Sequence, residues 1–86
     1  MEINELRYFV AVAKTENIHK ASQEISISPG SLSKAIARLE AELQIKLFDR
    51  IGRNIKLTSE GRFLKIRANE ILSLEEKTRI DVLGQV

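Results

Sequence analysis

The chain has 86 residues, enough for one small domain, and its 14 basic residues against 12 acidic ones give a net charge of only +2 at pH 7. The absence of cysteine excludes disulfides and thiolate metal sites and fits the reducing cytoplasm. The longest apolar run, Tyr8–Ala13, is far shorter than the roughly 20 residues that span a bilayer, and the acidic N-terminus is unlike a signal peptide, so we expect a soluble, cytoplasmic protein with no membrane partner.

The first predicted element is a helix near the N-terminus. Apolar residues recur there at spacings of three and four, which places them on one helical face. These residues are Leu6, Phe9, Val10 and Ala13. The helix is predicted to begin just after Asn4 and to end between Thr15 and Asn17.

A second, shorter helix of about two turns is predicted next. Ile18, Ala21 and Ile25 repeat the same spacing, and Asn17 stands where a side chain can cap the helix. The small Ala21 would let the first two helices approach closely. In the three-residue connection that follows, Ile27 is an apolar residue that can pack between the second helix and the next one.

The third helix has the strongest pattern and is predicted over residues 29–43. Ser28 can cap it, and Pro29 suits its first position, where a missing N–H leaves no intrahelical bond unmade. Four residues are spaced so that they face inward together. They are Leu32, Ile36, Leu39 and Leu43.

The period then changes to that of a short β-hairpin. Two short runs flank the sequence "IGRN", in which Gly52 supplies the backbone freedom of a tight reversal, so residues 47–58 predict a hairpin. From Ser59 the pattern is helical again, with Thr58 or Ser59 as the cap and no proline before Gly84. This last helix is predicted to have about six turns.

The order of these elements predicts a mainly α fold. Two short helices joined by three residues form a helix-turn-helix, and a following hairpin makes it winged. We therefore expect a winged helix-turn-helix domain over residues 1–58 and a long C-terminal helix over residues 59–86. A simple three-helix bundle would have the same apolar positions, so this order alone leaves both interpretations open.

The distribution of charge favours a nucleic-acid-binding surface. From Gln44 to Arg67 the chain has seven basic residues against only Asp49 and Glu60, a local charge of +5. The basic residues are Lys46, Arg50, Arg53, Lys56, Arg62, Lys65 and Arg67. Acids gather elsewhere, for example at Glu40 and Glu42. A solvated face normally mixes both signs, so this segment predicts a surface that meets a polyanion.

The outer face of the third helix has no acidic residue. It carries Gly30, Ser31, Ser33, Lys34, Ala37 and Arg38. A helix that enters the major groove brings its first turn close to base edges, which small side chains permit. Gly30 weakens a helix, so its place in the first turn indicates close approach of something outside the chain.

Four segments together resemble the N-terminal DNA-binding region of LysR-type transcriptional regulators. They are "LRYFVAVA", "KAS", "ISPGSLSKAIARLEAELQIKLFDR" and "LTSEG". The resemblance covers almost the whole chain and implies a winged helix-turn-helix with a linker helix that pairs antiparallel in a homodimer. It also implies that the chain is a DNA-binding fragment, and that a small-molecule effector binds only through a C-terminal domain missing here.

The resemblance implies that the partner is double-stranded operator or promoter DNA in the form of an interrupted inverted repeat, and it implies roles for individual residues there. Recognition helix 29–43 would lie in the major groove, and hairpin wing 47–58 at the minor groove or backbone. The implied major-groove residues are Pro29, Gly30, Ser31, Ser33 and Lys34, with Arg38 further along the helix. The implied minor-groove and backbone residues are Arg53 and Arg50, and the implied phosphate contacts are Asn17 and His19. His19 fits an ordinary exposed side chain equally well.

The chain departs from the family pattern at the start of the recognition helix. The family very often has Gln-Pro where this chain has Pro29-Gly30, and commonly Arg where it has Lys34. Glutamine can form two hydrogen bonds with adenine, and arginine can form two with guanine. Proline can form neither, and lysine acts as a point charge. We therefore expect sequence preference to depend more on Lys34, the two serines, minor-groove width at Arg53 and dimer spacing.

The last helix carries more apolar side chains than its own domain can cover. The predicted dimerisation residues are Phe63, Leu64, Ile71 and Leu74. The alternative function is a protein-interaction module that dimerises through helix 59–83 and leaves the basic segment unexplained. With one histidine, no cysteine and scattered carboxylates, the sequence predicts no enzyme, no metal site and no cofactor.

Overall fold

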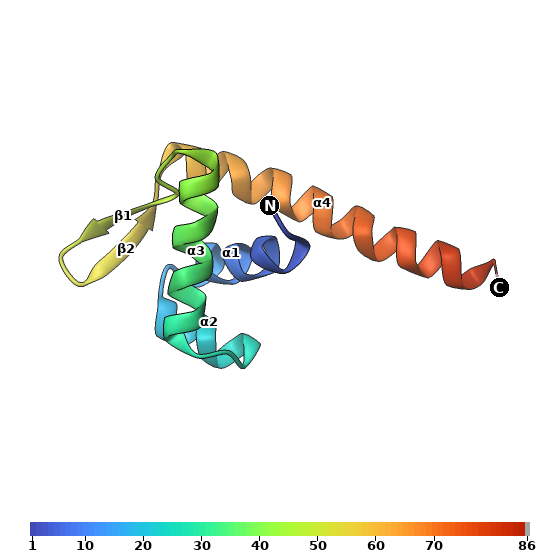
Figure 1. Ribbon diagram of the computed structural model, residues 1–86, viewed down its shortest axis with the longest axis horizontal. Helices are drawn as coiled ribbons and strands as arrows, with labels where there is room; N and C mark the ends of the chain where they lie inside the picture. The colour runs from blue at the N-terminus through green and yellow to red at the C-terminus, as the bar shows by residue number, and fades with distance from the viewer. Residues whose placement is uncertain (86) are drawn as a thin grey trace.

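The structure, a computed structural model, describes residues 1–85, and in it three helices form a cluster from which a hairpin and a long helix project (Figure 1). The elements are α1 (Ile3–Thr15), α2 (Ile18–Ile25), α3 (Pro29–Leu43), β1 (Phe48–Ile51), β2 (Asn54–Leu57) and α4 (Ser59–Gly84). The hairpin and the far end of α4 point in opposite directions, so the molecule measures 51 × 25 × 19 Å. The predicted winged helix-turn-helix with its long C-terminal helix is confirmed.

Side-chain caps determine where three of the helices begin. Asn17 accepts from the Lys20 N–H at 2.9 Å, and Ser28 accepts from the Ser31 N–H at 3.1 Å. Of the two predicted caps of α4, Thr58 is the one that acts, because its hydroxyl accepts from the N–H of the third helical residue at 2.9 Å. α4 is also longer than predicted, since its 26 residues make about seven turns.

The start of α1 was predicted about two residues too late. The helix begins at Ile3, because the Glu5 carboxylate accepts a hydrogen bond from the Glu2 N–H at 3.0 Å and so satisfies a free donor at the helix start. The buried face is also shifted slightly. Val10 is only half-buried, whereas Val12, which the pattern left out, is fully buried.

The core lies where α1, α3, the base of the hairpin and the first half of α4 meet. Its largest fully buried side chains are Phe9, Leu6, Leu32, Leu39, Leu47 and Val12. The rings of Phe9 and Phe48 lie 5.6 Å apart, which joins the hairpin to α1. The predictions for the turn are confirmed, since Ala21 is fully buried and Ile27 packs against the core.

The hairpin, which we call the wing, pairs its two strands in a simple antiparallel register. Phe48 lies opposite Leu57 and Ile51 opposite Asn54. Gly52 in the turn has a φ of 60°, the left-handed conformation that its position predicted. Only Phe48 among the strand residues is buried, and Ile55 and Leu57 are half-buried against the core, so the wing is exposed mainly toward its tip.

α4 belongs to the core over its first half and leaves it over its second. Gly61 and Ala68 are buried, whereas Leu74 is 65% exposed and Leu83 is 66% exposed. The core includes residues from both sides of residue 58. The predicted boundary there, between a DNA-binding domain and a C-terminal helix, therefore stays a prediction. Within residues 1–85, no helix combines the length and apolarity that a bilayer span requires.

Candidate nucleic-acid interface

The starts of α2 and α3 and the tip of the wing enclose an open cleft of about 390 Å³, which we call the helix–wing cleft. Seven of the ten residues predicted to contact DNA line it. They are Asn17, His19, Pro29, Gly30, Ser33, Arg50 and Arg53. Residues up to 36 positions apart in the sequence thus share one surface, although neither their spacing nor their periodicity places them together.

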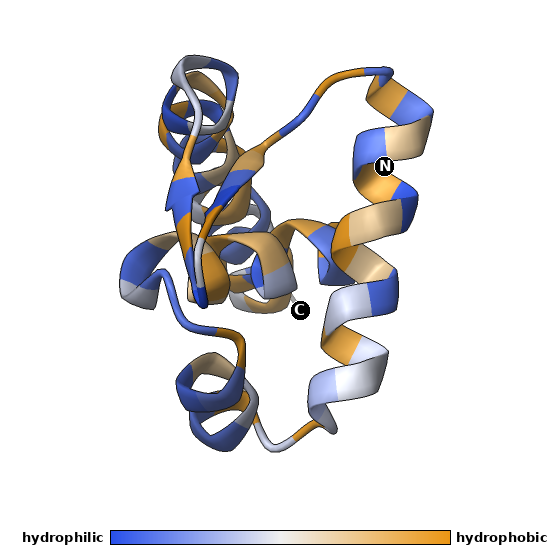
Figure 2. Ribbon diagram, turned by 90° about the vertical axis from the view of Figure 1, so that its left-hand side faces the viewer, coloured by the Kyte–Doolittle hydropathy of each residue, from blue (hydrophilic) through white to orange (hydrophobic). Residues whose placement is uncertain are grey.

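The α3 wall of this cleft is slim, and its first turn leaves the Gly30 N–H as a backbone donor, because Pro29 has no N–H and the Ser31 N–H donates to Ser28. A Cβ atom built on Gly30 would meet nothing within 4 Å, so the first turn faces open space. The Ser28 hydroxyl caps the helix and donates to the Ser31 hydroxyl at 2.9 Å. Figure 2 looks onto this side of the molecule, where the first turns of α3 carry mainly pale colours of intermediate hydropathy beside the wing.

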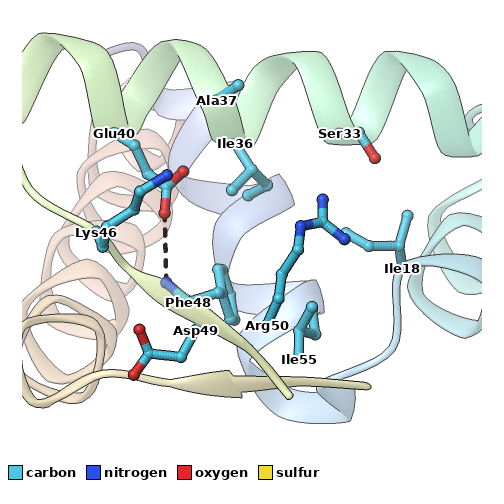
Figure 3. A pocket seen from close by; sticks show the side chains of 10 residues that line it. All are labelled: Ile18, Ser33, Ile36, Ala37, Glu40, Lys46, Phe48, Asp49, Arg50 and Ile55. Atoms are coloured by element: carbon cyan, nitrogen blue, oxygen red, sulfur yellow. Dashed lines mark hydrogen bonds between the residues drawn. The ribbon is translucent and has the colours of Figure 1, made fainter. Parts of the chain in front are cut away.

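The wing forms the opposite wall and carries unpaired positive charge. Among the described residues, Arg50 and Arg53 have no carboxylate within salt-bridge distance, and both side chains are exposed. Figure 3 shows the Arg50 side chain extending from β1 into the space between the wing and α3, which the apolar side chains of Ile36 and Ile55 also line. An arginine without a partner is free to pair with phosphate or a base edge.

Three predicted residues lie outside the cleft. Ser31, Lys34 and Arg38 are exposed on α3 but do not line it. Arg38 lies toward α1, with its Nε 3.7 Å from a carboxylate oxygen of Glu5. Its side chain remains 70% exposed, and its predicted role further along the helix stays a prediction.

The predicted basic segment divides between two elements. Lys46, Arg50, Arg53 and Lys56 belong to the wing and the loop before it. On α4, the Arg67 guanidinium lies 5.4 Å from the centre of the Phe63 ring and 3.4 Å from a Glu70 oxygen. Arg67 is therefore engaged within its own helix, whereas none of the four basic residues of the wing and its preceding loop forms a salt bridge among the described residues.

Two acidic residues hold the wing, and the sequence did not indicate either role. Glu40 does not line the helix–wing cleft, but its Oε2 accepts from the N–H groups of Leu47 at 2.8 Å and Phe48 at 3.3 Å at the base of the wing. Glu16 was not considered, and its Oε2 accepts from the Leu57 N–H at 2.8 Å. No sequence spacing could have indicated these bonds, because they depend on how the wing sits against the helices.

Comparison with known proteins decides the family. The model of the bacterial regulatory helix-turn-helix proteins of the lysR family matches residues 3–62. The chain belongs to the LysR family. The matched part runs from the first residue of α1 through the helix-turn-helix and the wing to the first turn of α4, and so includes every element of the helix–wing cleft.

Individual LysR relatives match most of the chain. An uncharacterised HTH-type transcriptional regulator of Azotobacter vinelandii is 44% identical over 92% of this chain and 55% of its own length. The regulator BenM of Acinetobacter baylyi is 42% identical over all of this chain and 33% of its own length. The solved BenM DNA-binding domain in complex with benA site 1 DNA has a TM-score of 0.95 at 36% identity, with both chains fully covered. The chain thus spans about half of the length of the first of these relatives and a third of the length of BenM.

Proposed function

We propose that this chain binds double-stranded DNA as the DNA-binding part of a LysR-type transcriptional regulator, and that it acts in the cytoplasm, not as an enzyme. The observation that carries the proposal is the helix–wing cleft, which brings seven of the ten predicted contact residues together. Its walls present positive charge from the wing and free N–H groups from two helix starts, and both suit phosphate.

The cleft has the shape of a site that straddles one DNA strand. With α3 in the major groove, Gly30 and Ser33 face the bases and Arg53 at the wing tip extends toward the minor groove. The strand between the grooves would then lie against Arg50 and the start of α2, where Asn17 and His19 are exposed. The complex of the BenM domain with DNA supports this assignment, because its fold superposes over the whole chain.

We further propose that a second copy of the chain covers the exposed apolar side of α4. Phe63 is 61% exposed and Leu74 is 65% exposed, and both are large apolar side chains that favour burial. Ile71 is 36% exposed, and Leu64 packs partly against its own core, so the roles of these two in dimerisation stay predictions. Effector binding would fall to a C-terminal domain of the full-length regulator.

The proposal is tested by fluorescence anisotropy of a labelled duplex over a series of salt concentrations. We expect affinity to fall by orders of magnitude over a few-fold rise in salt, and Lys34→Ala and Arg53→Ala each to weaken binding. Lys77→Ala on the far part of α4 is the control and should bind as the parent does. Selection from a random duplex pool should return an inverted repeat.

Two outcomes would contradict the proposal. One is binding that Lys34→Ala and Arg53→Ala leave unchanged. The other is a chain that associates through α4, loses that association in Leu74→Glu, and binds no duplex in any salt. The second outcome would favour the alternative, a protein-interaction module built on α4.

A further inference from the structure

Two carboxylates hold the base of the wing from opposite sides. Glu40 on α3 accepts from the N–H groups of Leu47 at 2.8 Å and Phe48 at 3.3 Å, where β1 begins, and Figure 3 shows the bond to Phe48. Glu16, directly after α1, accepts from the N–H of Leu57 at 2.8 Å, where β2 ends. Phe48 and Leu57 are opposite each other in the register, so the two carboxylates act at the same level of the hairpin.

Besides these bonds, the wing contacts the core through the buried Phe48 and the half-buried Ile55 and Leu57. Each strand has four residues, and a two-stranded hairpin of this size is marginally stable by itself. Beyond Phe48 its side chains are exposed or only half-buried. Hydrogen bonds to an ionised acceptor are shorter and stronger than those between neutral groups. The carboxylates are therefore well placed to fix the angle at which the wing leaves the core.

The backbone at Glu16 is consistent with such a role. Its φ of 51° lies in the left-handed region, which favours glycine or asparagine. Its N–H closes α1 by donating to the Val12 carbonyl, and its side chain is left to reach the wing, 41 residues further along the chain. A glycine would end α1 equally well but would not contact Leu57.

We propose that Glu16 and Glu40 are positioning residues that fix the wing relative to α3, and thereby determine where Arg50 and Arg53 meet DNA. The inference rests on the proposed function. Glu16 lines the helix–wing cleft beside both arginines. For the replacement of Glu16, the proposal and simple electrostatics therefore predict changes in DNA affinity of opposite sign. Removing a negative charge from a surface that faces phosphate should strengthen binding, whereas loss of the wing's position should weaken it.

The experiment compares Glu16→Ala, Glu16→Gln, Glu40→Ala and Glu40→Gln with the parent in duplex binding and, without DNA, in amide hydrogen exchange of the wing. We expect each alanine variant to bind roughly tenfold more weakly, as for loss of one arginine contact. Glutamine keeps an oxygen acceptor and should recover most of the affinity. The matched control is Glu24→Ala, an exposed acid on α2 that should bind as tightly as the parent or slightly tighter.

Combination with Arg53→Ala separates a positioning role from a general loss of stability. If the carboxylates act through the wing arginines, Glu16→Ala should have a much smaller effect on affinity once Arg53 is absent. Loss of stability alone would lower affinity equally in both backgrounds. Circular dichroism checks that each variant is folded, and the glutamine variants keep the test valid if Glu40→Ala unfolds.

The inference is overturned if Glu16→Ala binds as tightly as the parent or more tightly, as Glu24→Ala should. It is also overturned if the loss is the same with and without Arg53. If the parent binds no duplex, the proposed function has failed. Amide hydrogen exchange without DNA then tests whether the carboxylates position the wing. In that case the Leu57 N–H must exchange faster in Glu16→Ala than in the parent, and equal exchange refutes the role.

Discussion

Two helical glycines in this protein should respond in opposite ways to the same substitution. Gly30 lies in the first turn of α3 and Gly61 in the first turn of α4. Replacing a helical glycine with alanine stabilises a protein by about 0.4–1 kcal/mol where the backbone allows it, because the unfolded chain loses freedom. A Cβ atom at Gly30 would meet nothing within 4 Å, so we expect Gly30→Ala to be stabilising.

At Gly61 the same methyl group has no room. Its Cβ would overlap the Leu47 carbonyl oxygen and lie 2.8 Å from the Leu57 Cδ2. That carbonyl cannot move freely, because it accepts a hydrogen bond from the Thr58 N–H at 3.0 Å, and losing this bond costs about 0.5–1.5 kcal/mol. Overpacking costs about 1–3 kcal/mol in addition, which exceeds the gain of about 0.4–1 kcal/mol from the stiffer unfolded chain.

The assay is thermal unfolding at one fixed protein concentration, since association would make the midpoint concentration-dependent. A change of 1 kcal/mol moves Tm by about 4–8 °C in a domain of this size. We expect Tm to rise by a few degrees in Gly30→Ala and to fall by roughly 5–15 °C in Gly61→Ala. A Gly61→Ala protein as stable as Gly30→Ala would refute the reasoning. Gly30→Ala should also weaken duplex binding while it raises stability.

Two further substitutions test the core and the link between α1 and α4. Leu39→Ala removes a fully buried side chain and should lower the free energy of unfolding by about 2–5 kcal/mol in urea, whereas Leu39→Met should cost less than about 1.5 kcal/mol. The pKa of Glu75 is lowered, chiefly by the hydrogen bond from Arg79 and further by Arg7. A lowered pKa stabilises the fold at neutral pH and loses this effect as pH falls through the folded-state value. Thermal unfolding from neutral to acid pH should therefore show a smaller loss of stability in Glu75→Gln.

The order of the elements could be predicted because local signals agree with the fold. The apolar spacing of α3 and the caps Asn17, Ser28 and Thr58 act within a few residues of one another, and the structure uses all three caps. The start of α1 was missed because it depends on a carboxylate of Glu5 that reaches back to the Glu2 N–H. Such a bond replaces the usual short polar cap, and a search for Ser, Thr, Asp or Asn does not find it.

The site was predictable only in part, and for a different reason. Its residue types followed from charge and from the family resemblance, whereas periodicity could not bring the start of α2 and the wing together. Glu16 and Glu40 were missed because their partners are backbone N–H groups, which every residue possesses and no sequence pattern marks. Glu16 lies in a basic surface because its carboxylate accepts a hydrogen bond from the backbone of the wing, a role that charge alone does not indicate.

The short side chains at the start of α3 make the placement of the wing more important than it would be otherwise. Pro29 and Gly30 offer no side-chain hydrogen bond to a base, and the Ser31 hydroxyl, which accepts a bond from Ser28, offers only a short polar group. Discrimination between duplexes must then come increasingly from groove shape and from where Arg53 reaches it. An arginine can sense groove width only if the wing that carries it keeps a constant angle to α3. In this chain that angle depends on two carboxylates, so residues that never touch a base would contribute to the choice of operator.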